Sequence, residues 1–480
     1  MEIQFLGAAR EVTGSCFLIR IAGRSLLVEC GLIQGRPQDE ARNREPFGFD
    51  AAKLDAVVLT HAHLDHSGRL PLLVKAGYRG PIYTHAASRD LCHIMLKDAA
   101  YLNEKDAEWA NRKRQRKHLP AVEPLYTMRD AQRTMHRFKP LAYGEVREIL
   151  PGVRLRLNDA GHILGSAIVE LWLEEAGVQR KLVFSGDLGH RGAPILRDPS
   201  AVREADLVIM ESTYGDRRHR SWQDTWAELE EVLASARRDR GNILIPAFAV
   251  GRTQELLYAF AQHYDAWALD DWEIFLDSPM AIEATEVYAR HPEIYDAEAR
   301  SAKHQNGNPF LLPNLHLSRT PQQSMSINRI RSGAIIIAGS GMCDGGRIRH
   351  HLKHNIWRRD CHLLIVGFQA EGTLGRRLVD GATHISLWGE SMRVAAAVHT
   401  IGGFSAHADC DGLTAWFRNF TNDPSLVLVH GEPGAMDPLA ERLRAGIAGQ
   451  VFTPAPGTRL DLGTLRELGA RAGQVRHARH

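Results

Sequence analysis

The sequence predicts an α/β protein of at least two domains in which helices cover both faces of the sheets. Short runs of β-branched and apolar residues recur along the chain, among them Val57–Leu59 and Leu182–Phe184. Strands that are apolar along their whole length are covered on both faces, so helices are expected on either side of these sheets. The length of 480 residues also exceeds what one hydrophobic core supports.

Several of these predicted strands run directly into a histidine or a carboxylate. They are Val57–Leu59 before His61, Leu182–Phe184 before Asp187, Leu207–Met210 before Glu211, and Leu426–Val429 before His430. Polar residues that simply terminate strands would explain one or two cases, but not a set made almost wholly of His, Asp and Glu. Because such folds place their sites at strand ends, we expect a functional site there.

The middle of the chain predicts a second, smaller α/β domain of the doubly wound kind. Apolar strands are each followed by a Gly- or Ser-rich loop, and helical stretches lie between them. These strands are Gly241–Pro246, Ile274–Leu276, Ala334–Ala338 and Leu363–Val366. Such loops can hold phosphate through backbone N–H groups, but they are also an ordinary way to turn a chain, so both interpretations stay open.

Bulk composition excludes some classes of protein. Lys and Arg number 59 against 57 Asp and Glu, so any nucleic-acid partner must be held by local patches or by metal. Neither a secretory signal nor an apolar run of roughly 18 residues is present, so no membrane association is expected. The cysteines are scattered without a CxxC pair, which predicts reduced, buried thiols and a cytoplasmic protein. They are Cys16, Cys30, Cys92, Cys343, Cys361 and Cys410.

The segment His61-Ala62-His63-Leu64-Asp65-His66 predicts a metal site. In an extended loop residues two apart point the same way, so His61 and His63 can bind one ion together. Asp65 and His66 begin the following helix and suit a neighbouring ion. A single histidine is usually an ordinary core or surface residue, but four ligand types within six positions are not. This donor set favours zinc, with manganese or iron as alternatives.

Other strand ends supply the ligands that two ions still need. We expect His162 to complete the site of His61 and His63, Asp187 to bridge both ions, and His430 to complete the second site. Two ions roughly 3.5–4 Å apart activate water at neutral pH, so Asp65 and Asp187 are predicted to be catalytic as well. The expected cofactor is two Zn²⁺ per chain. The predicted ligands are His61, His63, Asp65, His66, His162, Asp187 and His430.

At these residues the sequence resembles the metallo-β-lactamase superfamily, whose hallmark is HxHxDH. More narrowly, it resembles the β-CASP branch of cleavage-factor-like and RNase J-like nucleases. The branch motifs are similar to Glu211–Gly215 (motif A), Phe404–Asp409 (motif B) and Val429–Glu432 (motif C), with Pro246–Arg252 and Gly339–Met342 matching the inserted domain. The resemblance covers nearly the whole chain except the basic tail, and the compact chain favours the cleavage-factor-like bacterial subgroup.

The resemblance implies an αββα sandwich interrupted by an α/β β-CASP domain. The implied parts are 1–213 and 387–465 for the sandwich, 214–386 for the inserted domain, and 466–480 for a basic tail in which disorder is one alternative. The segment Glu104–Pro124 is also basic. It is either a solvated helix face or a ridge beside an RNA channel.

The resemblance also implies a zinc-dependent ribonuclease that acts on single-stranded RNA. His407 would contact the scissile phosphate or protonate the departing 3′ oxygen, for which a pKa near operating pH is suited, and Glu211 would orient it. His430 favours RNA, because DNA-repair members carry valine there. The loops expected to hold flanking phosphates contain Arg252, Ser340, Gly341 and Gln369.

Several alternatives stay open. An endoribonuclease is expected, but 5′–3′ exonuclease activity is an alternative, and the oligomeric state is undecided, with a homodimer among the choices. Rival functions are a DNA nuclease or thioesterase-like enzyme of the same fold, and an inactive RNA-binding scaffold. One position departs from the family pattern: Glu29 stands where the family has aspartate behind the metal site. We expect this change to tune activity rather than abolish it.

Overall fold

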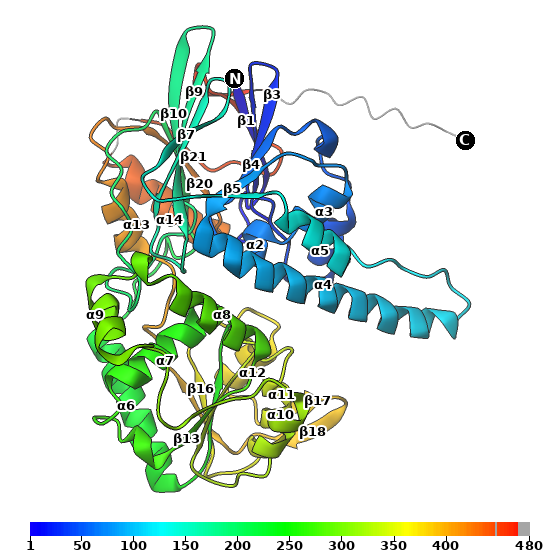
Figure 1. Ribbon diagram of the computed structural model, residues 1–480, viewed down its shortest axis with the longest axis vertical. Coiled ribbons are helices and arrows are strands. Elements are labelled where there is room, and N and C mark those ends of the chain that lie inside the picture. The colour runs from blue at the N-terminus through cyan, green and yellow to red at the C-terminus, as the bar shows by residue number, and fades with distance from the viewer. Residues whose placement is uncertain (447–448, 469–480) are drawn as a thin grey trace.

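The computed structural model describes residues 1–446 and 449–468. Two mixed sheets lie face to face in a sandwich, and an all-parallel sheet with its helices forms a separate lobe beside it (Figure 1). The predicted fold class is therefore confirmed. The predicted basic tail lies outside the described residues from position 469 onward, while Arg466–Leu468 form strand β23.

The first sandwich sheet has the strand order β23-β22-β1-β2-β3-β4-β5-β6. Its strands are β1 (Glu2–Gly7), β2 (Cys16–Ile21), β3 (Arg24–Val28), β4 (Ala56–Val58), β5 (Ile82–His85), β6 (Phe138–Leu141), β22 (Arg459–Asp461) and β23 (Arg466–Leu468). The helices of this half are α1 (Pro37–Glu40), α2 (Leu64–Ser67), α3 (Leu70–Lys75), α4 (Ala86–Gln115) and α5 (Met128–Met135). Strands β3 to β6 are parallel, so their carboxyl ends share one edge.

The second sandwich sheet has the order β21-β20-β11-β10-β9-β8-β7. Its strands are β7 (Val146–Leu150), β8 (Val153–Asp159), β9 (Ala167–Glu175), β10 (Val178–Phe184), β11 (Leu207–Glu211), β20 (Ser425–Val429) and β21 (Val451–Phe452). Helices α13 (Cys410–Phe417) and α14 (Pro433–Arg444) cover its outer face (Figure 1). Inward-facing residues of both sheets, such as Phe5, Leu26, Leu171 and Ile209, form one buried core between them.

We call the α6–β19 region, residues 222–400, the inserted lobe. Its sheet has the all-parallel order β14-β13-β15-β12-β16-β19. Its strands are β12 (Ile243–Pro246), β13 (Glu273–Leu276), β14 (Leu315–Leu317), β15 (Ala334–Ala338), β16 (His362–Ile365) and β19 (Ala397–Thr400), with β17 (His384–Leu387) and β18 (Glu390–Arg393) as a separate hairpin. Its helices are α6 (Trp222–Asp239), α7 (Arg252–Gln262), α8 (Pro279–Arg290), α9 (Ala297–Asn306), α10 (Pro321–Ile327), α11 (Ile348–Asn355) and α12 (Leu374–Val379).

One expected domain boundary does not match the strand pairing. Residue 386 falls inside β17, and the chain then returns to the lobe as β19, which pairs with β16 through His362↔Ala397. The six-stranded sheet therefore extends to Thr400, and the sandwich resumes only after that residue.

The lobe is packed tightly against the sandwich rather than loosely tethered. A single buried apolar cluster runs from α4 through Leu164 and Leu196 into α7 and α8 of the lobe. The backbone N–H of Leu164 donates to the hydroxyl of Tyr288 at 3.2 Å, and His291 at the end of α8 contacts Asp90 on α4 at 2.9 Å. These contacts fix the lobe beside the strand ends on which the candidate site lies.

Two further expectations concern the whole chain. All six cysteines are free and buried, as predicted for reduced thiols. Among the described residues, none of the helices combines the length and apolarity needed to cross a membrane.

Candidate metal centre

Three histidines from two segments form the first half of the site. His61 and His63 follow β4, and His162 follows β8. The Nδ1 atom of His63 lies 3.2 Å from Nε2 of His61 and 3.1 Å from Nε2 of His162. His61 and His162 are buried, and His63 is half-buried. The two-residue spacing of His61 and His63 therefore places both imidazoles on one side of the loop.

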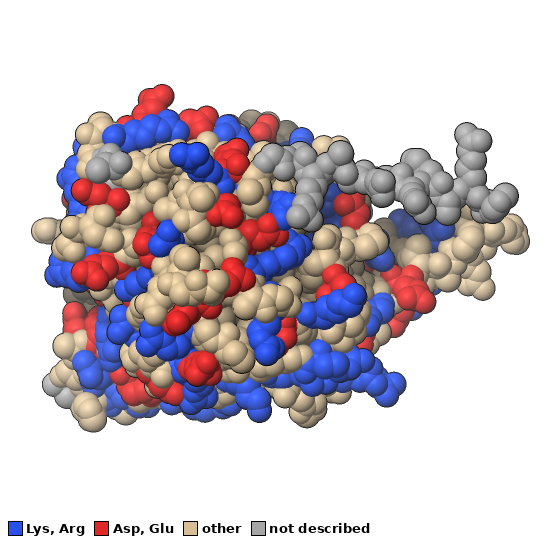
Figure 2. Space-filling model, turned by 90° about the horizontal axis from the view of Figure 1, so that it is seen from above, with Lys and Arg blue, Asp and Glu red and all other residues tan. Residues whose placement is uncertain are grey.

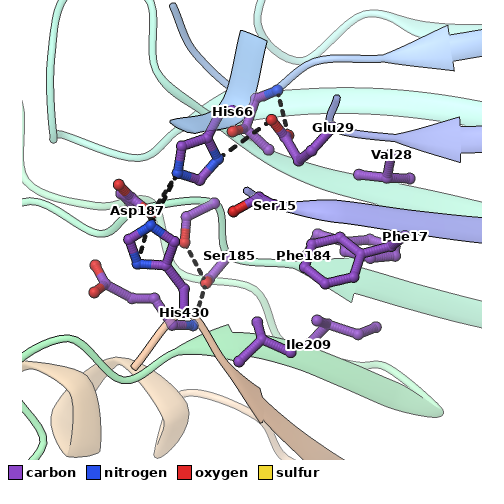
Figure 3. A pocket seen from close by; sticks show the side chains of 14 residues that line it. Ser15, Phe17, Val28, Glu29, His66, Phe184, Ser185, Asp187, Ile209 and His430 are labelled. Atoms are coloured by element: carbon purple, nitrogen blue, oxygen red, sulfur yellow. Dashed lines mark hydrogen bonds and ion pairs between the residues drawn. The ribbon is translucent and has the colours of Figure 1, made fainter. Parts of the chain in front are cut away.

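The second half of the site lies on the other side of the first. His66 belongs to the short helix α2, and His430 follows β20. Their Nε2 atoms are 3.2 Å apart, and Nε2 of His430 lies 3.3 Å from Oδ2 of Asp65. In the close-up view His66 and His430 point toward each other (Figure 3). The fold thus brings together two histidines that are 364 residues apart in the sequence.

Asp187 lies between the two groups of histidines. Its Oδ2 atom is 3.5 Å from Nε2 of His61 and 3.6 Å from Nε2 of His162, while its Oδ1 atom is 3.3 Å from Nε2 of His66. One carboxylate oxygen therefore faces each group. Side-chain donors within 4.8 Å of one another form three sets that could hold ions: His61, His63, His162 and Asp187; Asp65, His66 and His430; Asp187, Glu211 and His430.

The spacing and the unpartnered atoms of this arrangement fit zinc. Ligand atoms about 2.0–2.1 Å from a tetrahedral zinc lie roughly 3.4 Å apart, which is close to the separations found here. Oδ1 of Asp187 is buried and accepts no hydrogen bond from any described residue. A buried carboxylate oxygen without a donor is costly unless a cation satisfies it. The donor set and the unpartnered oxygen both indicate a place for bound metal.

The far ring nitrogens of three histidines are held by neighbouring groups. Nδ1 of His61 lies 2.9 Å from the hydroxyl of Thr60, Nδ1 of His162 donates to the carbonyl of Ala406 at 3.0 Å, and Nδ1 of His430 lies 3.0 Å from the hydroxyl of Thr213. Such partners fix the orientation of an imidazole and leave Nε2 free for an ion. The groups to which these contacts are made are Thr60, Thr213 and the Ala406 carbonyl.

Sequence reasoning missed these supporting groups. Thr60 directly precedes His61, so its position offered a weak signal. Thr213 lies 217 residues from His430, and the Ala406 contact is made by a backbone carbonyl, so neither residue type nor spacing could have identified them.

Electrostatics differ between the two halves of the site. Burial lowers the pKa of His63 to about 4 and the pKa values of His61 and His162 well below their usual range. The neutral imidazole that metal binding requires is thus favoured. Burial acts in the same direction on His66, but Asp187 and the nearby Asp65 outweigh it and raise the pKa of His66. The carboxylates therefore favour positive charge in the second half of the site.

Glu29 supports the second half from behind. Its backbone has a φ of 65°, which is uncommon for a non-glycine residue, and its side chain is buried. Oε1 accepts the N–H of Thr60 at 2.8 Å, and Oε2 lies 3.3 Å from Nδ1 of His66 (Figure 3). Glu29, which stands where the family has aspartate, therefore contacts the predicted metal ligand His66 directly.

His407 and Glu211 form a pair at the edge of the metal centre. Nδ1 of His407 lies 3.2 Å from both carboxylate oxygens of Glu211, whose Oε1 also accepts the N–H of Leu188 at 2.6 Å. The His407 side chain is 20% exposed, whereas that of Glu211 is 1% exposed. Burial opposes the charged imidazole, but the Glu211 carboxylate outweighs it and raises the pKa of His407 to about 9. Glu211 therefore favours the charged form of His407, which is the more exposed member of the pair.

The residues expected to hold flanking phosphates lie at the loops of the inserted lobe. Arg252 is buried, forms an ion pair with Glu255, and places its guanidinium 4.8 Å from the centre of the Phe404 ring. Gln369 is buried and its amide donates to the carbonyls of Gly341 and Gly367 at 2.9 and 3.1 Å. The hydroxyl of Ser340 accepts the N–H of Gly345 at 3.1 Å. These side chains brace the loops, and their contact with phosphate stays a prediction.

The fold and the site define a metal-dependent hydrolase. Three family models match in chain order: the metallo-beta-lactamase superfamily over 9–236, the Beta-Casp domain over 253–378, and the Zn-dependent metallo-hydrolase RNA specificity domain over 391–454. The chain belongs to the metallo-β-lactamase superfamily and to its β-CASP branch, as the resemblance of its motifs implied.

Relatives over most of the chain agree with this family. A ribonuclease of Thermus thermophilus is 41% identical over 432 residues, which cover 90% of this chain and 93% of that protein. The transcription termination factor FttA of Methanocaldococcus jannaschii is 31% identical over 95% of this chain and 70% of its own length. A crystal structure of a protein of unknown function from Enterococcus faecalis has a TM-score of 0.53 at 13% identity, and the match covers 96% of this chain and 99% of that chain. That likeness concerns the fold alone.

Proposed function

We propose that the protein is a zinc-dependent ribonuclease that hydrolyses phosphodiester bonds in single-stranded RNA with two zinc ions. The observation that carries the proposal is the position of Asp187, with one carboxylate oxygen toward each group of histidines. A single carboxylate between two sets of nitrogen donors is the arrangement that two adjacent ions require. His61, His63 and His162 would hold one ion, and Asp65, His66 and His430 the other.

Bound zinc would supply an activated water for attack on phosphorus and would neutralise charge on the phosphate oxygens. The protein's own residues then complete the reaction. Because Nδ1 of His407 is held by Glu211, Nε2 is the ring nitrogen left to act on the substrate. His407 can there donate a proton to the departing 3′ oxygen, and Glu211 stabilises its charged form. The products would carry a 5′-phosphate and a 3′-hydroxyl.

Three observations support RNA as the substrate. The closing segment of the chain matches a domain described as specific for RNA, and a relative that is 41% identical is named a ribonuclease. Histidine at position 430 also matches RNA-acting members of the family rather than the DNA-repair branch.

A comparison of RNA and DNA oligonucleotides of one sequence tests the proposal. The zinc-loaded wild type is expected to cut the RNA, and Asp187→Ala is expected to lose both zinc and cleavage. Preferential cutting of DNA would overturn the choice of substrate, and equal activity in both proteins would end the metal-dependent mechanism.

We propose internal cleavage as the principal mode of action. RNAs labelled at the 5′ end, with either a triphosphate or a monophosphate, should then yield discrete fragments. Release of mononucleotides from the 5′ end, dependent on the monophosphate, would instead establish a 5′–3′ exonuclease.

A further inference from the structure

The longest helix of the protein extends far beyond the body of the sandwich. Helix α4 spans 30 residues, and buried side chains are concentrated in its first half, up to Ala100. Its second half projects past both the sandwich and the inserted lobe (Figures 1 and 2). We call residues 101–124, which comprise this projecting half and the segment that returns from it, the arm.

The arm is a braced element. The side chain of Asn111 donates to the carbonyl of Val122 at 2.9 Å and accepts the N–H of Val122 at 2.8 Å. Nε of Arg114 donates to the carbonyl of Pro120 at 2.5 Å, and Ala107 is buried. These contacts use one side of the helix and hold the returning segment along it. On the opposite side Tyr101 and Trp109 are exposed, and Lys105 forms an ion pair with Glu108 at 2.9 Å.

Aromatic and cationic side chains alternate along the arm at helical spacing. Tyr101, Lys105, Trp109 and Lys113 succeed one another every four residues, so they form one stripe. Tyr101 is 51% exposed and Trp109 is 61% exposed. The Lys105 ammonium lies 5.7 Å from the centre of the Tyr101 ring, and the Lys113 ammonium lies 3.4 Å from that of Trp109. The stripe is about 18 Å long, because a helix rises about 1.5 Å per residue.

The end of the arm carries concentrated positive charge. Between Trp109 and Val122 there is no Asp or Glu, and the cations there are Arg112, Lys113, Arg114, Arg116 and Lys117. The chain as a whole is nearly neutral, with 59 basic against 57 acidic residues, and the two signs intermingle over the body on the face shown in Figure 2. Exposed aromatic rings interleaved with cations are the chemistry that binds single-stranded nucleic acid, by stacking bases and by pairing with phosphates.

We propose that the arm is a second RNA-binding surface, which holds single-stranded RNA by stacking on Tyr101 and Trp109 and by phosphate contacts from its basic end. This inference rests on the proposed ribonuclease function and deepens it. The arm would hold a distant part of a long substrate while the metal centre cuts, so it contributes to the affinity for long RNA and takes no part in the chemistry.

Binding and salt dependence test the arm directly. In the full-length Asp187→Ala protein, which is not expected to cut RNA, anisotropy of a fluorescein-labelled 20-nucleotide single-stranded RNA gives the Kd. Adding Tyr101→Ala and Trp109→Ala is expected to raise the Kd roughly tenfold or more, since one stacked base contributes about 1–3 kcal/mol. Adding Lys113→Ala and Lys117→Ala should reduce the slope of log K against log salt by about 1.4.

Trp388→Ala is a matched control, because Trp388 is 50% exposed and carries the Arg349 guanidinium 4.8 Å from its ring centre, but lies on the β17–β18 hairpin. It should leave the Kd unchanged. An unchanged Kd and salt slope in both arm variants would overturn the inference. Equal losses for a 20-base-pair RNA duplex would overturn the stacking mechanism. The protein could instead self-associate in a concentration-dependent way. If Trp109→Ala abolished that association and left RNA binding intact, the partner of the arm would be a second copy of the chain and not RNA.

Cleavage kinetics separate this inference from the proposed function. With catalytically intact protein, the arm variants should raise KM for the 20-nucleotide RNA, leave kcat unchanged, and cut a five-nucleotide RNA as the wild type does. If the wild type cuts no RNA but the arm variants bind RNA more weakly, the proposed ribonuclease function is wrong and RNA binding by the arm is supported. If RNA is cut and the KM of the arm variants equals that of the wild type, the ribonuclease function is supported and RNA binding by the arm is rejected.

Discussion

Asp187 lies among histidines and Asp277 lies beside one, and these two buried aspartates have opposite surroundings. In the inserted lobe, Oδ2 of Asp277 accepts from Ser324 and His351, each at 2.6 Å, and Oδ1 accepts from Arg347 at 2.7 Å. In the sandwich, Oδ1 of Asp187 accepts no hydrogen bond from a described residue and faces imidazole nitrogens.

The difference separates a structural carboxylate from one that requires a cation. A buried charge that is fully hydrogen-bonded needs nothing else and stabilises the fold through its partners. A buried charge that lacks well-aligned hydrogen bonds is tolerated only where positive charge, from a bound cation or a charged imidazole, completes its surroundings. Histidine and aspartate are close together at both places, so residue composition alone would not distinguish them.

The largest effect should come from removing the charge of Asp187. Asp187→Asn keeps the shape of the side chain but removes the negative charge that the proposed zinc ions would need. We expect zinc content to fall and kcat/KM for RNA to drop by more than the roughly 10–100-fold seen for groups behind metal ligands. Metal analysis and initial rates measure both. Full zinc content together with wild-type cleavage would show that Asp187, like Asp277, has only a structural role.

Replacing His407 should leave the metal centre intact and slow the chemistry. His407→Gln removes a proton donor, so kcat should fall by roughly 10²–10⁴-fold while zinc content stays unchanged. A phosphodiester with a p-nitrophenyl leaving group needs no protonation and should be cut by His407→Gln at nearly the wild-type rate. A comparable loss with that substrate would mean that His407 acts on the metal site rather than on the leaving oxygen.

Replacing Asp277 should affect stability instead of activity. Asp277→Ala leaves Arg347 and His351 without their buried acceptor, at a cost of about 3–5 kcal/mol in the free energy of unfolding. Urea denaturation measures this loss, and the folded fraction is expected to retain its zinc and its kcat. Loss of zinc from folded Asp277→Ala would contradict the division between the two aspartates.

The smallest effect is expected at Glu29, which lies behind the second group of ligands. Glu29→Asp restores the residue of the family pattern but withdraws the carboxylate from His66 by one methylene. We expect zinc affinity at that half of the site to change by roughly tenfold. Glu29→Gln is the matched control, because it keeps the length and removes the charge. Equal zinc affinities in wild type and both variants would show that His66 needs no support from Glu29.

Much of the fold was readable from local patterns. Strands such as Val57–Leu59 and Leu426–Val429 are apolar throughout, and they are buried strands of the sandwich. The inserted lobe likewise has the parallel sheet that its strand–loop–helix pattern predicts. The pairing of β19 with β16, beyond the expected domain end at residue 386, could not be predicted, because strand pairing leaves no signal in composition.

The sequence by itself determined the kinds of candidate ligand and the position of the first four, since His61 to His66 lie in one continuous segment, the loop after β4 and the start of α2, and their geometry is local. The sequence predicted a position between the two groups for Asp187, but only the tertiary structure set its distances to the histidines and gave Asp277 a different set of partners. His66 and His430 are 364 residues apart, and their 3.2 Å contact depends on the packing of two sheets. The apolar pattern sets which face of a strand is buried, but the donors that surround a buried carboxylate come from other segments, so its hydrogen bonding exists only in the folded chain.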